Sequence, residues 1–397
     1  MKKTILLTLL ITQFYACSSF EMSAENKQNQ KFSKFSQQFT NPDHIQTTDE
    51  VKILAELQIM TPYIQSLNIQ SLNEQGQMPK IRDNLYLDFA NLNAAYSEYL
   101  VFHHCINLSE KYFLNAEHTY LKLLQDFPYD ENLLYNISIF YARNSVPFDD
   151  DQHQQIRTQL LEKSKQYAEK IQETNTDNQQ HKHHYYAVLS ELLNALDKQK
   201  IRKDQQKALI QTLQPFLFEL LEQPNMDYDS GNFFILVKYY DQYLKAYYPQ
   251  QAKSWLKQNQ NKILAFYNSH QDENTQRNNT ISAQLYALLD QPEKALYFLK
   301  LLKFTEKDNY TPPDILDAQL FDKMRHSKAF QDWFSRYSQE YQAYLEQNPK
   351  VCNSLQSSVH SEIKLLNNQK PKNVLEINKN VSEAPKSSPK LEQKSGK

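Results

Sequence analysis

The sequence predicts an all-α protein in which helix pairs are stacked one after another along the chain, an architecture called an α-solenoid. Between residues 47 and 350, apolar residues recur at intervals of three and four, the period of a helix, while the alternating pattern of a strand is nearly absent. Glycine is scarce, with only Gly76 and Gly231 in this body. Phosphate-binding loops, dinucleotide-binding motifs and nucleophile elbows need clustered glycines, so the sequence excludes these three kinds of site.

The first helix of the body is expected near Thr47, because Thr47-Thr48-Asp49-Glu50 can form a capping box before an apolar run. Further helical signals follow in order over 85–102, 113–126, 133–142, 156–172, 185–195, 207–221, 233–248, 252–267, 281–289, 294–302 and 315–344. The turns between them are short and polar, which favours paired helices. From Asp149 to Gln206 the regular spacing is lost, so we expect the helices in the middle of the solenoid to be either longer or irregular.

Two stretches carry a spacing typical of helix pairs that pack closely. In the first, Ala116, Tyr120 and Leu123 mark one helix face, and Pro128 follows Ala116 by twelve residues. In the second, Ala295 follows Ala283 by twelve residues. Small alanines let two antiparallel helices approach, and proline stops a helix. The spacings resemble those of the tetratricopeptide-repeat family, which implies a tetratricopeptide-like α-solenoid of stacked antiparallel helix pairs.

This resemblance implies that a partner binds to the inner helix of each pair. In the unit after Pro128, the side chains that do not pack on the neighbouring helix are expected to be Asn132, Tyr135, Asn136, Ile139 and Arg143. The corresponding later unit offers Thr280, Gln284 and Leu288. Asn136 and Arg143 are suited to hold the backbone or a carboxylate of a peptide. The alternative is that each is an ordinary polar surface residue.

The N-terminus has the three parts of an export signal. Lys2 and Lys3 are followed by a short apolar run and then by Ala16 and Cys17. The sequence 14–19 resembles a bacterial lipobox, in which the cysteine thiol receives a diacylglycerol and the preceding peptide is removed. Ser18, in place of aspartate, resembles the sorting pattern for the outer membrane of Gram-negative bacteria. The alternative is an ordinary secretory signal that is cut elsewhere.

These features divide the chain into four predicted parts. Residues 1–16 are a lipoprotein signal peptide, 17–46 a lipidated Cys17 with a flexible tether, 47–350 the helical domain and 351–397 a disordered basic tail. In the tether, Phe32, Phe35 and Phe39 have helical spacing, but three apolar residues in a polar stretch are expected to bury too little surface for order. The net charge of −2 gives no indication of nucleic-acid binding.

Two cysteines remain besides Cys17. Cys105 and Cys352 can form a disulfide in an oxidising periplasm, and the alternative is two separate buried thiols. The histidines near 103 and 181 lack the spacing of a known metal site, so no metal and no cofactor is expected. We expect His181, His183 and His184 at the surface start of a helix.

A tyrosine stripe of Tyr239, Tyr243 and Tyr247 can either stack on sugar rings or pack in the core. Since no catalytic signature is present, the leading hypothesis is a non-enzymatic lipoprotein. It is anchored to the outer membrane, faces the periplasm and binds a protein or peptide partner of the envelope. The alternative hypothesis is a cell-wall glycan-binding protein or enzyme that uses the tyrosine stripe.

Overall fold

A computed structural model describes residues 24–40, 45–46, 49–66, 80–103, 105–148, 153–174, 178–271, 275–302 and 320–347. Cys17, Cys352, Thr47 and the expected signal peptide and tail lie outside these residues. Within them the chain contains helices and turns but no strand. The helices are α2 (Ala24–Ser36), α3 (Glu50–Ser66), α4 (Lys80–Phe102), α5 (Ile106–Asp126), α6 (Glu131–Ser145), α7 (Gln154–Thr174), α8 (Gln179–Lys198), α9 (Lys203–Glu222), α10 (Ser230–Tyr247), α11 (Pro249–Ser269), α12 (Thr275–Leu288), α13 (Pro292–Leu301), α15 (Asp322–Arg325) and α16 (Lys328–Gln347), with the 3-10 turns η1 (Gln37–Phe39) and η5 (Val146–Phe148).

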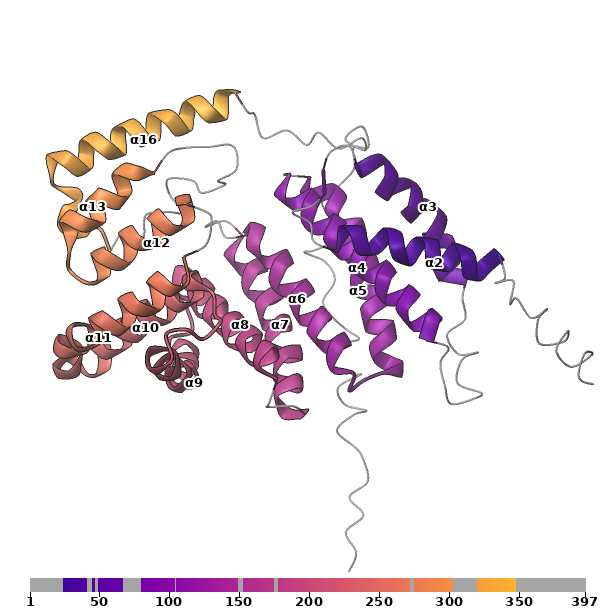
Figure 1. The fold of residues 1–397 in the computed structure, drawn as a ribbon, viewed down its shortest axis with the longest axis horizontal. Helices are drawn as coiled ribbons and strands as arrows, with labels where there is room; N and C mark the ends of the chain where they lie inside the picture. The colour runs from indigo at the N-terminus through magenta and orange to yellow at the C-terminus, as the bar shows by residue number, and fades with distance from the viewer. Residues whose placement is uncertain are drawn as a thin grey trace, which may run out of the picture. The chain divides into compact units, whose positions relative to one another are not determined.

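Consecutive helices pack as antiparallel pairs, which confirms the predicted all-α solenoid. Figure 1 shows α4 beside α5, α6 beside α7, α10 beside α11 and α12 beside α13, and α8 also contacts α9. Successive pairs are joined because α4 contacts α6, α8 contacts α10, and α10 contacts α12. The even-numbered helices from α4 to α12 therefore belong to one layer of the stack. Three hydrophobic clusters follow one another along the chain and form the core.

Three helices of this layer begin in the same way. Asp130, Asn178 and Asp229 are the N-cap residues of α6, α8 and α10, and each side chain accepts a hydrogen bond from the backbone N–H three residues later. The distances are 2.8, 3.3 and 2.8 Å. An N-cap side chain satisfies one of the free donors at a helix start. By contrast, α11 and α13 of the other layer begin with Pro249 and Pro292, which suit the first helical position.

Small side chains hold α6 against α7. Ser138 and Ser164 are fully buried, and each hydroxyl donates to the backbone carbonyl of the other residue, at 2.9 and 2.7 Å. The two hydroxyl oxygens are 3.0 Å apart. In the α12/α13 pair, Ala283 and Ala295 are likewise fully buried. The two helices of a pair can approach closely only where such positions are small.

The prediction of a flexible tether over residues 17–46 is wrong for residues 24–40, which are ordered. Residues 24–36 form α2, which packs on α4. Phe32 and Phe39 are 1% and 7% exposed, and Phe32 packs on Phe89 with ring centroids 6.5 Å apart. The phenylalanines of this segment pack against apolar residues of the core that α4 helps to form. The apolar surface that the segment buries therefore includes surface supplied by α4, which the pattern of the segment itself does not reveal.

The middle of the stack, where the regular spacing is lost, consists of continuous helices. The helices α7 and α8 have 21 and 20 residues, the same lengths as α5 and α9. The helical signal over 315–344 is divided, since α15 ends at Arg325 and α16 begins at Lys328. Pro128 lies two residues beyond the end of α5, as expected. Among the described residues, no helix is both long and apolar enough to cross a membrane.

We predict that Ser138→Leu destabilises the protein. The larger side chain has no space against α7 and removes the hydroxyl bonds to Ser164, so a loss of about 3 kcal/mol in the free energy of unfolding is expected. Asn132→Leu, on the exposed face of the same helix, is the matched control and should change stability by less than about 0.5 kcal/mol. Thermal unfolding followed by circular dichroism measures both variants. Equal midpoints for the two would contradict the packing described above.

Candidate partner-binding surface

Five residues of α6 lie on the side of the helix that does not pack on α7. We call Asn132, Tyr135, Asn136, Ile139 and Arg143 the α6 stripe. Asn132 and Arg143 are exposed, whereas the other three are half-buried. Their neighbours in sequence Leu133, Leu134, Ile137 and Ser138 are buried. The stripe expected from the sequence is therefore a surface of mixed polarity along one helix.

Tyr135 connects the stripe to α8. Its hydroxyl accepts a hydrogen bond from Gln180 Nε2 at 3.0 Å. Its ring packs against the imidazoles of His181 and His184, with centroids 4.8 and 5.1 Å away. The surface around Tyr135 thus combines residues of two successive helix pairs, and it is held by ring packing that leaves Tyr135 partly open to solvent.

Ser138 also connects α6 to His184 of α8. His184 Nε2 lies 2.7 Å from Ser138 Oγ, within hydrogen-bonding distance, and either atom can be the donor, depending on the tautomer of the ring. The buried serine pair is therefore in contact with the next helix pair of the stack.

Burial keeps His184 neutral. Desolvation, together with the nearby His181 and Arg143, lowers the pKa of His184 to about 4. The imidazole is consequently uncharged at neutral pH and acts as a hydrogen-bonding group in the wall beside the stripe. The pKa of His183 is also lowered by desolvation, on the side of α8 that packs on Phe216 and Tyr228.

Arg143 is the charged end of the α6 stripe. After desolvation and His181, it contributes to the lowered pKa of His184. Burial raises the pKa of Tyr120, and Arg143 offsets part of that rise; the Tyr120 hydroxyl donates to Asn91 Oδ1 at 2.6 Å. Within the part of the chain that the structure describes, no carboxylate forms an ion pair with Arg143. An exposed guanidinium without an internal partner can bind a carboxylate with two parallel hydrogen bonds.

The binding positions predicted on α12 are less exposed to solvent than the α6 stripe. Gln284 on α12 is half-buried, and it already interacts within the chain. Its neighbours Thr280 and Leu288 on the same face are buried. The structure thus leaves Asn132 and Arg143 of α6 exposed, whereas it buries Thr280 and Leu288 beside Gln284 on α12.

The histidine segment of α8 does not lie on the surface as expected. It does stand at the start of a helix, but His181 is only 6% exposed, and His184 is held by Ser138 and Tyr135. No local sequence pattern indicates this contact, because Ser138 and His184 are 46 residues apart. Among the described residues, which do not include His104, no three His, Cys, Asp or Glu side chains are placed to hold a metal.

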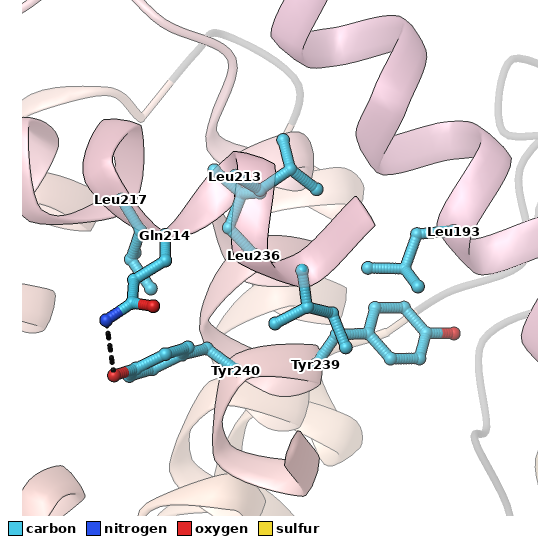
Figure 2. Close-up of a pocket in the computed structure, with 8 residues that line it drawn as sticks. Leu193, Leu213, Gln214, Leu217, Leu236, Tyr239 and Tyr240 are labelled. Carbon is cyan, nitrogen blue, oxygen red and sulfur yellow. Dashed lines mark hydrogen bonds between the residues drawn. The ribbon is translucent and has the colours of Figure 1, made fainter. Parts of the chain in front are cut away.

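The tyrosine stripe of α10 is largely core. Tyr239 and Tyr243 are buried, while Tyr247 is 48% exposed. Figure 2 shows the small cavity beside Tyr239 and Tyr240, which is lined mainly by leucines of α8, α9 and α10. Gln214 Nε2 donates to Tyr240 Oη at 3.2 Å across it. Its volume of about 10 Å³ is at the lower limit for one water molecule, so it is a packing gap.

A second hollow lies at the edge of α7 and the turn before α9. Its volume is about 270 Å³, and six of its seven lining residues are polar, including Glu162 and Arg202, which form an ion pair. Ligand sites are usually larger and mostly apolar. None of the residues predicted to bind a partner lines either hollow.

Cys105, directly before α5, is buried and disulfide-bonded. Its partner lies outside the described residues, where the chain has Cys17 and Cys352. If Cys17 carries a lipid, Cys352 is the cysteine that remains. The pair Cys105 and Cys352 stays a prediction.

We predict that His184 makes stability depend on pH. The unfolded chain binds a proton as the pH falls through about 6.5, whereas folded His184 stays neutral until about 4. Its stabilising contribution is complete above pH 6.5 and is lost as the pH falls toward 4. Between pH 7.5 and 5 this amounts to about 2 kcal/mol.

Urea unfolding of His184→Gln at the two pH values tests this prediction. The variant should lose less stability on acidification than the natural chain, with the remaining loss coming from groups such as His183. His118→Gln, on the exposed face of α5, is the control and should keep the full loss. An unchanged pH dependence in His184→Gln would show that this histidine is not held neutral.

Comparisons with known proteins leave the surface to be interpreted from its own chemistry. No protein-family model matches this chain, and no curated protein or solved structure matches it. The functional interpretation therefore depends on the α6 stripe, on the layer of helices that holds it and on the sequence of the N-terminus.

Proposed function

We propose that the protein is a non-enzymatic, lipid-anchored scaffold that binds an extended segment of a partner protein along the α6 stripe. The observation that carries this proposal is Arg143, an exposed guanidinium without an ion-pair partner among the described residues, at the end of a partly open helix face. A carboxylate of the partner is the group that Arg143 would bind. No cofactor takes part.

The neighbouring side chains suit an extended peptide. Asn132 and Asn136 offer both a donor and an acceptor to a peptide backbone, and Ile139 offers a small apolar contact between them and Arg143. His184 adds an uncharged hydrogen-bonding group close to Arg143. This combination of amide, apolar and cationic groups on a rigid helix resembles the binding face of tetratricopeptide repeats, and we propose that the stack belongs to that general type.

The proposed location at the outer membrane is supported by the sequence of the N-terminus. The lipobox-like sequence ending in Ala16-Cys17-Ser18 supports a lipid on Cys17 and sorting to the outer membrane, with the helical body facing the periplasm. A disulfide at Cys105 is in keeping with an oxidising compartment such as the periplasm.

The alternative, binding to cell-wall glycan, has less support. Two of the three tyrosines in the proposed stacking stripe are buried, which leaves Tyr247 and its neighbour Tyr248 as exposed rings. Their exposed fractions of 48% and 46% allow stacking on a single sugar. The α6 stripe offers a longer surface and a charge, so the peptide proposal is preferred.

We predict that a photoreactive amino acid at Asn136 crosslinks to a specific envelope protein in living cells. Arg143→Glu should abolish the adduct, because the carboxylate of the partner would then face a like charge, whereas Arg143→Lys should retain part of it. The control position is Leu114, which is 49% exposed on α5 in the other layer. The proposal fails if Leu114 gives the same adduct or if Arg143→Glu leaves the Asn136 adduct unchanged.

We further predict that the protein incorporates radiolabelled palmitate at Cys17. Cys17→Ala should lose the label and should leave the membrane pellet, because the acyl chains provide the anchor. Cys105→Ser, which removes a different cysteine, should keep the label. Equal labelling of the natural chain and Cys17→Ala would contradict the lipoprotein assignment.

A further inference from the structure

The exposed face of α3 is unusually apolar for a solvated surface. Val51 and Ile59 are 58% and 53% exposed, and Ala55 and Pro62 are exposed with them. These residues are spaced by four, four and three, so they lie along one side of the helix. The opposite side packs into the core through residues such as Ile53, Leu57 and Met60. The helix is therefore apolar on two faces, of which only one is covered within the described chain.

The charges around this face are paired. Lys52 is the only charged side chain among the exposed residues that the structure describes on α3, and its Nζ lies 3.0 Å from Asp49 Oδ1. Glu50 is buried, and Glu56 pairs with Lys31 of α2 at 3.3 Å. The described residues therefore place no unpaired carboxylate on the apolar strip. An exposed apolar strip without a net negative charge is suited to lie on a lipid surface.

The position of α2 brings this face near the N-terminal end of the chain. Asn29 Nδ2 donates to the hydroxyl of Tyr63 at 3.4 Å, and Lys31 binds Glu56, so α2 runs antiparallel beside α3. In Figure 1 the two helices lie next to each other. The first residue of α2, Ala24, precedes Asn29 by about 8 Å of helix, which places it near the end of α3 that carries Ile59 and Pro62.

The length of chain before α2 limits how far the body can stand from a lipid at Cys17. Only residues 18–23 separate Cys17 from Ala24. Even fully extended, that stretch reaches about 25 Å. Because α2 is part of the folded body, a lipid on Cys17 would keep Ala24 within that distance of the membrane surface, and the end of α3 lies beside this part of α2.

We propose that the face of α3 formed by Val51, Ala55, Ile59 and Pro62 lies on the membrane in which the lipid of Cys17 is embedded. This inference rests on the proposed lipidation of Cys17. The aliphatic side chains enter the boundary between headgroups and acyl chains. The α6 stripe is carried by another part of the stack and is not needed for this contact.

Fluorescence quenching by labelled lipids tests the contact. The full-length, lipidated Ile59→Cys variant is labelled with bimane without reductant and placed in vesicles of phosphatidylethanolamine and phosphatidylglycerol that contain a nitroxide at headgroup depth. We expect at least about twofold quenching, because the probe would lie within about 5–10 Å of the headgroups. Tyr297→Cys, on α13 and similarly exposed at 59%, is the matched control and should be quenched little.

Each outcome separates this proposal from its alternatives. Equal quenching at positions 59 and 297 overturns it. A probe at position 59 that is shielded from aqueous iodide but not quenched by lipid means that protein, such as a second copy of the chain, covers α3, which also overturns it. Palmitate labelling of the same sample distinguishes failure of the α3 contact from failure of the proposed lipid anchor. Labelled protein without quenching refutes only the α3 contact, whereas unlabelled protein refutes the anchor on which it rests.

Discussion

The close contact between α6 and α7 is the constraint on which the candidate site depends. Ser138 and Ser164 exchange hydrogen bonds with each other's backbone and leave no space for a larger side chain. This contact fixes the rotation of α6 about its own axis. The residues on the far side, from Asn132 to Arg143, are therefore open to solvent for the same reason that Ser138 is buried.

The same serine pair also extends its effect to the next helix pair. Ser138 Oγ, which is bonded to Ser164, also lies within hydrogen-bonding distance of His184 Nε2. His184 in turn packs against Tyr135 of the stripe. A connected polar network of this kind holds its members in one arrangement, which a surface needs if it is to recognise a partner without ordering itself first.

The features of the fold that follow from local sequence pattern could be predicted from the sequence. The period of the apolar residues predicted the helices, Pro128 predicted the end of α5, and the alanines at 283 and 295 predicted a close pair. Contacts between residues that are distant in the sequence could not be predicted. Phe32 is ordered by Phe89, and His184 by Ser138, and neither pairing leaves a trace in local spacing. The loss of regular spacing between Asp149 and Gln206 predicted longer or irregular helices, and α7 and α8 are continuous helices with the lengths of α5 and α9.

The incorporation of α2 into the folded body bears on how strong a membrane contact would need to be if Cys17 carries the proposed lipid. A group held on a short chain beside its target experiences an effective concentration on the order of millimolar. With only residues 18–23 between Cys17 and α2, a lipid contact at α3 would be half occupied even with a dissociation constant in that range. A few aliphatic side chains would then be sufficient. Such a contact would add little to the binding by acyl chains, but it would restrict the orientations of the body and so the faces of the stack that can meet other proteins.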